Sequence, residues 1–121
     1  MTKISSQIND CPVIAVQNLL AGKWKLVILW HLSKNTRRFN EPQKLLPEIS
    51  QGILTQQLRE LERDQLVHRE IYKEVPPKVE YSLTDIGRSL IPVMDVIAKW
   101  GLEYLDHKQE ANDETQARGK D

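Results

Sequence analysis

The sequence is poor in cysteine, has no long apolar run and carries no excess of either charge. Cys11 is the only cysteine among 121 residues, so no disulfide can form within one chain, which fits a reducing compartment. The longest apolar run, residues 26–30, is far too short to cross a bilayer. Residues 1–10 are polar and contain no apolar segment of the signal-peptide type. A cytoplasmic protein without a membrane partner is therefore expected.

Net charge does not select a partner. The 17 lysines and arginines offset the 17 aspartates and glutamates, which gives a formal charge of +0, so a polyanion would have to be met by local placement of cations. Hydrophobic residues make up 40% and charged residues 28%, as in globular domains. We expect an N-terminal arm at 1–10, one folded domain at 11–105 and a polar, disordered tail at 106–121.

The sequence also lacks the patterns that mark catalysis. It has no glycine-rich phosphate loop, no nucleophile elbow and no paired-carboxylate motif. His31, His68 and His107 share no metal-ligand spacing with one another or with Cys11. An enzyme would need a polar cleft with perturbed acids or bases. Neither an enzyme, nor a metal site, nor a cofactor is expected.

Helical apolar spacing fills the first half of the chain. Residues 12–22 and 23–33 have this spacing, and the second segment is apolar almost all round, which predicts a deeply buried helix. A third, brief helix is predicted over residues 40–46. Ser50 is an N-cap candidate for the next one. Two short helices that meet across the tight PEIS turn predict a helix-turn-helix.

The pattern then changes to alternation. Residues 67–72 and 78–83 are strand-like, and the segment KEVPP joins them as a hairpin. Thr84 is an N-cap candidate for a last long helical segment, in which Pro92 predicts a kink or break. The predicted fold is mainly α with a small β-hairpin, an α+β winged helix-turn-helix with extra N- and C-terminal helices.

The helix after Ser50 keeps carboxylates away from the centre of its outward strip. Leu54, Leu58 and Leu61 form its buried stripe. The outward strip carries amides and guanidinium groups. Such groups bond base edges and phosphates in a major groove. The predicted DNA-contacting residues of this helix are Ser50, Gln51, Gly52, Thr55, Gln56, Arg59 and Arg63. The alternative is a solvated helix face that lacks central acids by chance.

Basic residues at the flanks favour double-stranded DNA as the partner. They precede the helix-turn-helix, lie in its first helix or bracket the tip of the hairpin, where a winged helix could grip backbone phosphates. Each one alone is an ordinary surface cation. These residues are Lys34, Arg37, Arg38, Lys44, Lys73 and Lys78.

Residues 93–105 carry apolar side chains on more than one helix face. A 121-residue monomer has too little core to bury them all. The surplus predicts a partner, most simply a second copy of the chain.

At this point a resemblance can be named. The runs CPVIAVQNLLAGKWKLVILWHL, RRFNEPQKLLPEISQGILTQQLRELERDQLV and YKEVPPKVEYSLTDIGRSLIPVMDVIAKW are similar to the HxlR family of bacterial winged-helix regulators. The match runs from about Cys11 to Trp100, and the motifs GKWK, RRFNE, LTQQLRELE and VPPKVEYSLT are specific. It implies a dimeric DNA-binding transcriptional regulator whose first and last helices build the dimer. The implied interface residues are Val13, Val16, Met94, Ile97, Trp100 and Tyr104.

Two positions depart from the family pattern. Gly52 stands where members commonly carry a lysine or similar residue, so one DNA contact is missing. Gln65 replaces the usual glycine after the helix that begins at Ser50, which the resemblance makes the recognition helix. A side chain at that position predicts a modest strain in the backbone. Gly52 and the neutral net charge support an alternative function, a winged-helix protein-interaction module without specific DNA binding.

Cys11 is a candidate redox sensor. It directly precedes Pro12 at the start of a predicted helix, where the helix dipole stabilises negative charge and favours a reactive sulfur. Some members of the resembled family sense oxidants or electrophiles through a cysteine in this region. An oxidant or small-molecule effector is therefore a candidate partner. The alternative is a small residue that packs or caps without a redox role.

Overall fold

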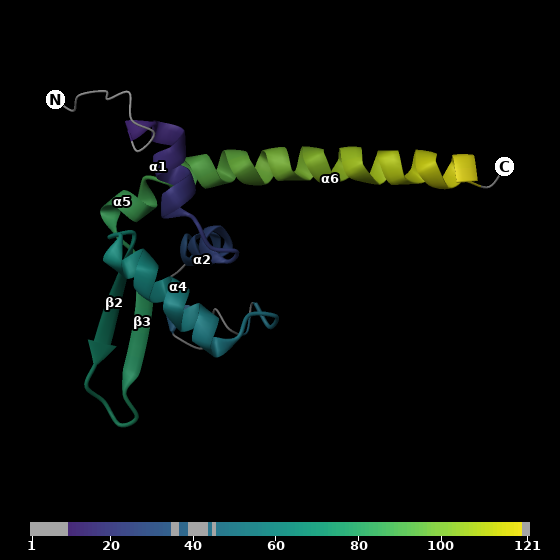
Figure 1. The fold of residues 1–121 in the computed structure, drawn as a ribbon. Helices are drawn as coiled ribbons and strands as arrows, with labels where there is room; N and C mark the ends of the chain where they lie inside the picture. The colour runs from purple at the N-terminus through teal and green to yellow at the C-terminus, as the bar shows by residue number, and fades with distance from the viewer. Residues whose placement is uncertain (1–9, 35–36, 39–43, 45, 120–121) are drawn as a thin grey trace. The chain divides into compact units, whose positions relative to one another are not determined.

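The computed structural model describes residues 10–34, 37–38, 44 and 46–119. The chain divides into two units, residues 1–88 and 89–121, where the sequence predicted one domain over 11–105. The elements of the first unit are α1 (Pro12–Leu19), α2 (Lys25–Leu32), β1 (Arg37–Arg38), α4 (Gln51–Arg63), β2 (Val67–Tyr72), β3 (Lys78–Leu83) and α5 (Asp85–Arg88), and the second unit contains α6 (Ile91–Gly119) (Figure 1).

The first unit is a winged helix. Its hairpin pairs β2 with β3 antiparallel, from Val67 opposite Leu83 to Tyr72 opposite Lys78, as the alternating pattern predicted. A third strand was not predicted: Arg37 and Arg38 form β1, and the strand order is β1-β3-β2. The sequence did not indicate it, because two residues are too few to show an alternating pattern.

The core of this unit lies between α2, α4 and the hairpin, which contact one another. Leu54, Leu58 and Leu61 of α4 have no exposed surface, as their spacing predicted. Tyr81 of β3 is also buried. Its burial raises the pKa of its hydroxyl, an effect that the nearby Arg69 partly opposes. The other buried apolar residues that the structure describes in this unit are Ile28, Leu29, Leu32, Ile49, Leu66, Val67 and Leu83.

One end of α4 is capped by its N-cap residue, and the other is followed by a left-handed turn. The hydroxyl of Ser50 accepts a hydrogen bond of 3.2 Å from the backbone N–H of Ile53. Past the other end, Gln65 has φ of 66°, and the N–H of Leu66 reaches back to the carbonyl of Leu61 at 3.0 Å. This left-handed position is where the resemblance placed a glycine. It fixes the short turn through which α4 leads into the hairpin.

Thr84 links the end of the hairpin that lies away from its tip to the turn after α4. The hydroxyl of Thr84 accepts from the N–H of Gly87 at 3.1 Å and donates to the carbonyl of Gln65 at 2.6 Å. Thr84 is thus the predicted N-cap. A Cβ at Gly87 would clash with the backbone carbonyl oxygen of Leu66, so only glycine fits there without a backbone shift.

Replacing Gly87 with alanine is therefore expected to lower the free energy of unfolding by about 2–3 kcal/mol, the cost of forced overpacking. Thermal or urea denaturation followed by circular dichroism measures this loss. Gly52→Ala is the matched control, because a Cβ there meets nothing within 4 Å. That variant should be neutral or more stable by up to about 1 kcal/mol. Equal stability of the two variants would contradict the packing described for Gly87.

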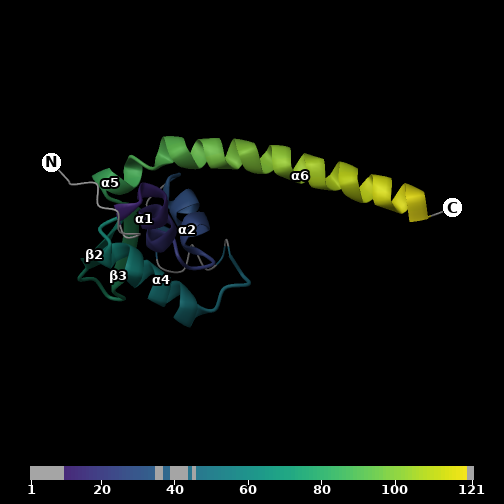
Figure 2. The same ribbon diagram turned by 45° about the horizontal axis from the view of Figure 1, so that its top comes forward.

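The second unit is a single helix, α6, which continues to Gly119 (Figure 2). It begins at Ile91, after α5 has ended at Arg88, so the break predicted before Pro92 is present. The tail differs from the prediction, because residues 106–119 are helical rather than disordered. Its two alanines, two glutamates, two glutamines, Lys108 and Arg118 are good helix formers and extend an existing helix readily. Gln109 bonds Asp113 one turn later at 3.1 Å.

Among the residues that the structure describes, no helix has the length and apolar character needed to cross a bilayer.

Candidate nucleic-acid interface

The outward strip of α4 is open to solvent, as the sequence predicted. Gln51, Gly52, Gln56, Arg59 and Arg63 are all exposed, as is their cap Ser50, because the buried leucine stripe turns the opposite side of the helix outward. The strip presents two kinds of polar side-chain group, the amides of Gln51 and Gln56 and the guanidinium groups of Arg59 and Arg63.

Thr55 is the exception within this strip. It is half-buried, and its hydroxyl donates a hydrogen bond of 2.9 Å to the carbonyl of Gln51. Such a bond one turn back is typical of threonine in a helix. The oxygen of Thr55 keeps only acceptor capacity for a ligand, which makes it a weaker candidate than Gln56 or Arg59.

Four residues of α4 line an open surface hollow of about 460 Å³: Gln56, Arg59, Glu60 and Arg63. Two guanidinium groups and one amide there can donate to phosphate oxygens or to the edge of a base. The only acid among these lining residues is Glu60.

The acids at the borders of the strip are all engaged with cations. Each of the three carboxylates that lie between Glu60 and Asp64 has a basic partner within 3.5 Å. The pairs are Glu60 with Lys25 at 3.2 Å, Glu62 with Arg69 at 3.4 Å and Asp64 with Arg63 at 3.5 Å. The strip therefore faces outward without an unpaired carboxylate on its flanks, which suits a polyanionic ligand.

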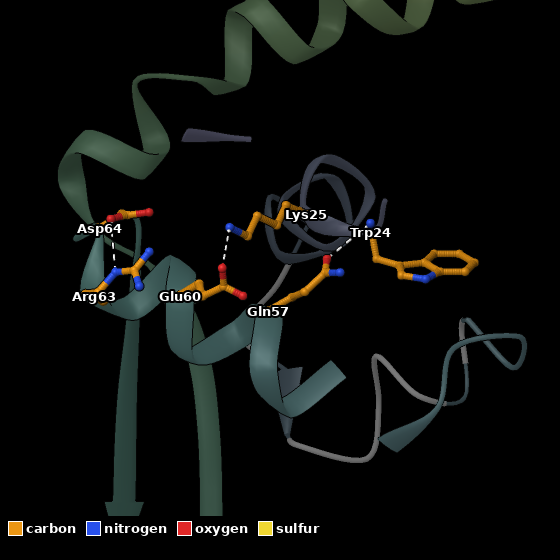
Figure 3. Close-up of polar contacts among 6 residues, drawn as sticks. All are labelled: Trp24, Lys25, Gln57, Glu60, Arg63 and Asp64. Carbon is orange, nitrogen blue, oxygen red and sulfur yellow. Dashed lines mark hydrogen bonds and ion pairs between the residues drawn. The ribbon is translucent and has the colours of Figure 1, made fainter. Parts of the chain in front are cut away.

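The turn before α2 holds α4 through two polar contacts that the sequence prediction missed (Figure 3). The backbone N–H of Trp24 donates to the Oε1 of Gln57 at 3.1 Å, and the Nζ of Lys25 bonds Glu60. Lys25 is only 2% exposed. A signal was available, because Gln57 lies three residues after Leu54 on the apolar stripe. A polar residue in such a position predicts a buried partner.

The flanking cations are only partly placed as predicted. Lys44 and Lys73 are exposed, and Lys73 lies at the tip of the hairpin. Lys78, by contrast, is half-buried and already occupied: its Nζ lies 2.8 Å from Glu80 and over the ring of Tyr72. It is therefore less available to a phosphate than the sequence suggested.

Arg37 and Arg38 contribute the backbone of β1. Their side chains lie outside the described residues, as does most of the third helix predicted over 40–46. Lys34 is exposed and its Nζ lies 4.1 Å from the centre of the Trp30 ring. Its cation is thus held against the end of α2.

An apolar stripe runs along one side of α6. Val93, Ile97, Trp100 and Tyr104 recur at the spacing of a single helix face, at about 100° per residue, and are between 41% and 62% exposed. The rings of Trp100 and Tyr104 stack with centroids 5.6 Å apart. Met94, which the sequence placed in the dimer interface, is different. It lies about 100° from Val93 around the helix and is only 2% exposed.

The start of α1 has the features predicted for it. Val13 and Val16 are 73% and 48% exposed. Cys11 is half-exposed and is the N-cap residue, with Pro12 directly after it. Its carbonyl accepts a hydrogen bond of 2.9 Å from the N–H of Ala15. Its sulfur makes no capping bond, and the residue is partly open to solvent.

Within the described part of the chain, no three histidine, cysteine, aspartate or glutamate side chains gather as a metal site would require.

Comparisons with known proteins identify the relatives of this chain. A family described as HxlR-like helix-turn-helix matches residues 19–109. An uncharacterised helix-turn-helix-type transcriptional regulator of Bacillus subtilis, YdeP, is 53% identical over 102 residues, which cover 84% of this chain and 80% of the relative. Among solved structures, the redox regulator HypR in its reduced form has 45% identity and a TM-score of 0.78, over 83% of this chain and 99% of that one. The reduced form of the transcriptional regulator YodB from B. subtilis has 35% identity and a TM-score of 0.66, over 74% of this chain and 89% of that one.

Proposed function

The chain belongs to the HxlR-like helix-turn-helix family and is a DNA-binding transcriptional regulator, and we propose that it reads its operator with the outward strip of α4. The recognition helix enters the major groove, with Gln56 and Arg59 near base edges. Arg63 and Lys73 hold phosphates on either side. Its place of action is the cytoplasm, where a prokaryotic regulator meets DNA.

One observation carries this proposal: α4 exposes Gln56 and Arg59 at its open hollow, and its three bordering acids are each paired with a cation, Asp64 with Arg63 of the same strip. A face of this kind lowers the electrostatic cost of approaching phosphates without a large net charge on the protein. The neutral net charge is therefore compatible with DNA binding.

A gel-shift titration tests the proposal. The protein is titrated against the intergenic DNA beside its own gene and against a coding fragment of equal length, at about 50 mM and about 200 mM salt. Specific binding should be at least about a thousandfold tighter on the intergenic fragment and should weaken with salt. Equal, weak affinity for both fragments would instead support a protein-interaction module.

The proposed active form is a homodimer. Its support is the exposed apolar stripe on α6 and, separately, the exposed valines of α1, because exposed apolar surface favours association. A two-fold dimer predicts inverted half-sites whose centres are one helical turn apart, roughly 10 base pairs, or a multiple of it.

The proposed signal is an oxidant that acts on Cys11. Its support is the partly exposed cysteine at the start of α1 and the likeness to the redox regulator HypR. Because the chain has one cysteine, two chains must each give one thiol to an intersubunit disulfide, while a mild oxidant such as diamide takes up the two protons and two electrons.

Treatment with diamide should therefore double the mass of the protein on a non-reducing gel and change its affinity for operator DNA several-fold. Cys11→Ser should stay at monomer mass and keep the affinity of the reduced protein. Reduction with dithiothreitol should restore the untreated wild type. Unchanged DNA affinity after full oxidation would contradict a sensing role for Cys11.

A further inference from the structure

Glu60 is unusual among the residues that face the proposed DNA surface. It is the one carboxylate among the residues that line the hollow beside Gln56, Arg59 and Arg63, and its side chain is 29% exposed. A carboxylate so close to the guanidinium groups would repel any phosphate that they attract. Its charge must be compensated if the strip is to bind DNA well.

The positive charge that compensates Glu60 comes from a buried lysine. Lys25 reaches Glu60 from α2, with its Nζ 3.2 Å from the Oε1 of Glu60 (Figure 3). The lysine side chain is 3% exposed, so it cannot itself touch DNA. A buried ammonium group is costly unless it is paired, and this cost holds the lysine close to its carboxylate.

The same turn fixes the position of the pair. Gly22 has φ of 149°, and a Cβ there would lie 3.3 Å from the side chain of Gln57. The N–H of Trp24 bonds that same side chain at 3.1 Å. The GKWK motif, residues 22–25, therefore contacts α4 at two successive turns, and the second contact is the ion pair.

We propose that Lys25 is a positioning residue for DNA binding: it neutralises Glu60 and holds it back, so that the strip of Gln56, Arg59 and Arg63 faces phosphates as a net cation. This inference rests on the proposed function of α4. It assigns a binding role to a side chain that makes no contact with the ligand. The competing explanation is an ion pair that serves only to fold the unit.

Rescue separates these two explanations. Lys25→Met removes the cation and leaves Glu60 unpaired. Operator affinity should fall about tenfold at about 50 mM salt, as for a new charge repulsion at a surface site. Because salt screens this repulsion, the deficit should shrink at about 200 mM. Adding Glu60→Gln to the same chain removes the repelling charge and should restore most of the affinity.

The measurements use the full chain in gel-shift titrations at both salt concentrations, with thermal unfolding of each variant. Lys108→Met is the matched control: it removes one cation from an exposed position on α6 and should bind as the wild type does. A wild type that fails to select operator DNA refutes the proposed function, whatever the variants do. A wild type that binds, with a Lys25→Met deficit that neither salt nor Glu60→Gln reduces, refutes only the role of Lys25.

Glu60→Gln alone keeps the proposal testable if Lys25→Met does not fold. The amide still offers an oxygen to Lys25, while the surface loses a negative charge. Operator affinity should rise about threefold at low salt and converge with the wild type at high salt. Weaker binding by this folded variant would overturn the neutralising role, because it would show that the carboxylate itself is needed.

Discussion

Arg59→Ala should weaken specific operator binding by about 1–3 kcal/mol and weaken binding to unrelated DNA by less, because only the lost cation matters there. The reason is that Arg59 is exposed at the centre of the strip beside the hollow, where a guanidinium group can bond the edge of a guanine with two hydrogen bonds. Its loss removes sequence discrimination at one base pair. Competition gel shifts with single-base operator variants would measure both the affinity and the relaxed preference.

Lys73→Ala is the matched comparison, because Lys73 is an exposed cation at the hairpin tip. It should lower affinity for all sequences alike and reduce the slope of log affinity against log salt by about one unit. Unfolding curves should match the wild type for both variants. If Arg59→Ala behaved as Lys73→Ala is expected to, Arg59 would be a phosphate contact and not a base contact.

Trp100→Glu should abolish the dimer at micromolar concentrations. Trp100 lies in the middle of the apolar stripe of α6, is 62% exposed and stacks on Tyr104. A central aromatic contact contributes at least about 2 kcal/mol to an interface. In a two-fold dimer each substitution occurs twice, so the dissociation constant should rise about a thousandfold. Analytical ultracentrifugation measures the mass, and operator affinity should fall with it.

Leu102→Glu is the matched control for this experiment. Leu102 is equally exposed, at 66%, but it lies on the opposite side of α6, about 200° from Trp100 around the helix. This variant should remain dimeric. Dissociation by Leu102→Glu together with a stable Trp100→Glu dimer would show that the two copies meet through the other side of α6.

Strong local signals explain what could be predicted from the sequence. The strands at 67–72 and 78–83 agree with the structure to the residue. The second alternates apolar and polar side chains over six residues, which is typical of a strand with one buried face. Ser50 and Thr84 cap their helices, since each hydroxyl satisfies an N–H that the helix leaves unpaired. The outward direction of Gln56 and Arg59 follows directly from the leucine stripe opposite them.

The features that could not be predicted depend on contacts between residues distant in sequence, or on a small free-energy difference between helix and disorder. The pairing of Lys25 with Glu60 joins residues 35 positions apart, and nothing local to either one indicates the partner. The strand at Arg37 exists because β3 is beside it. Residues 106–119 are polar enough for disorder, yet they continue a helix already formed by residues 91–105, which removes the nucleation cost.

The central claim is that two copies of α4 read two major-groove segments. Dimethyl sulfate footprinting of the intergenic operator tests it most directly, because this reagent reports on guanine N7 in the major groove. We expect two protected segments of inverted sequence, with centres separated by roughly 10 base pairs or a multiple of it. In the Arg59→Ala complex, formed at saturating protein, one guanine in each segment should become reactive again. A single protected segment, or an identical footprint with Arg59→Ala, would contradict the account.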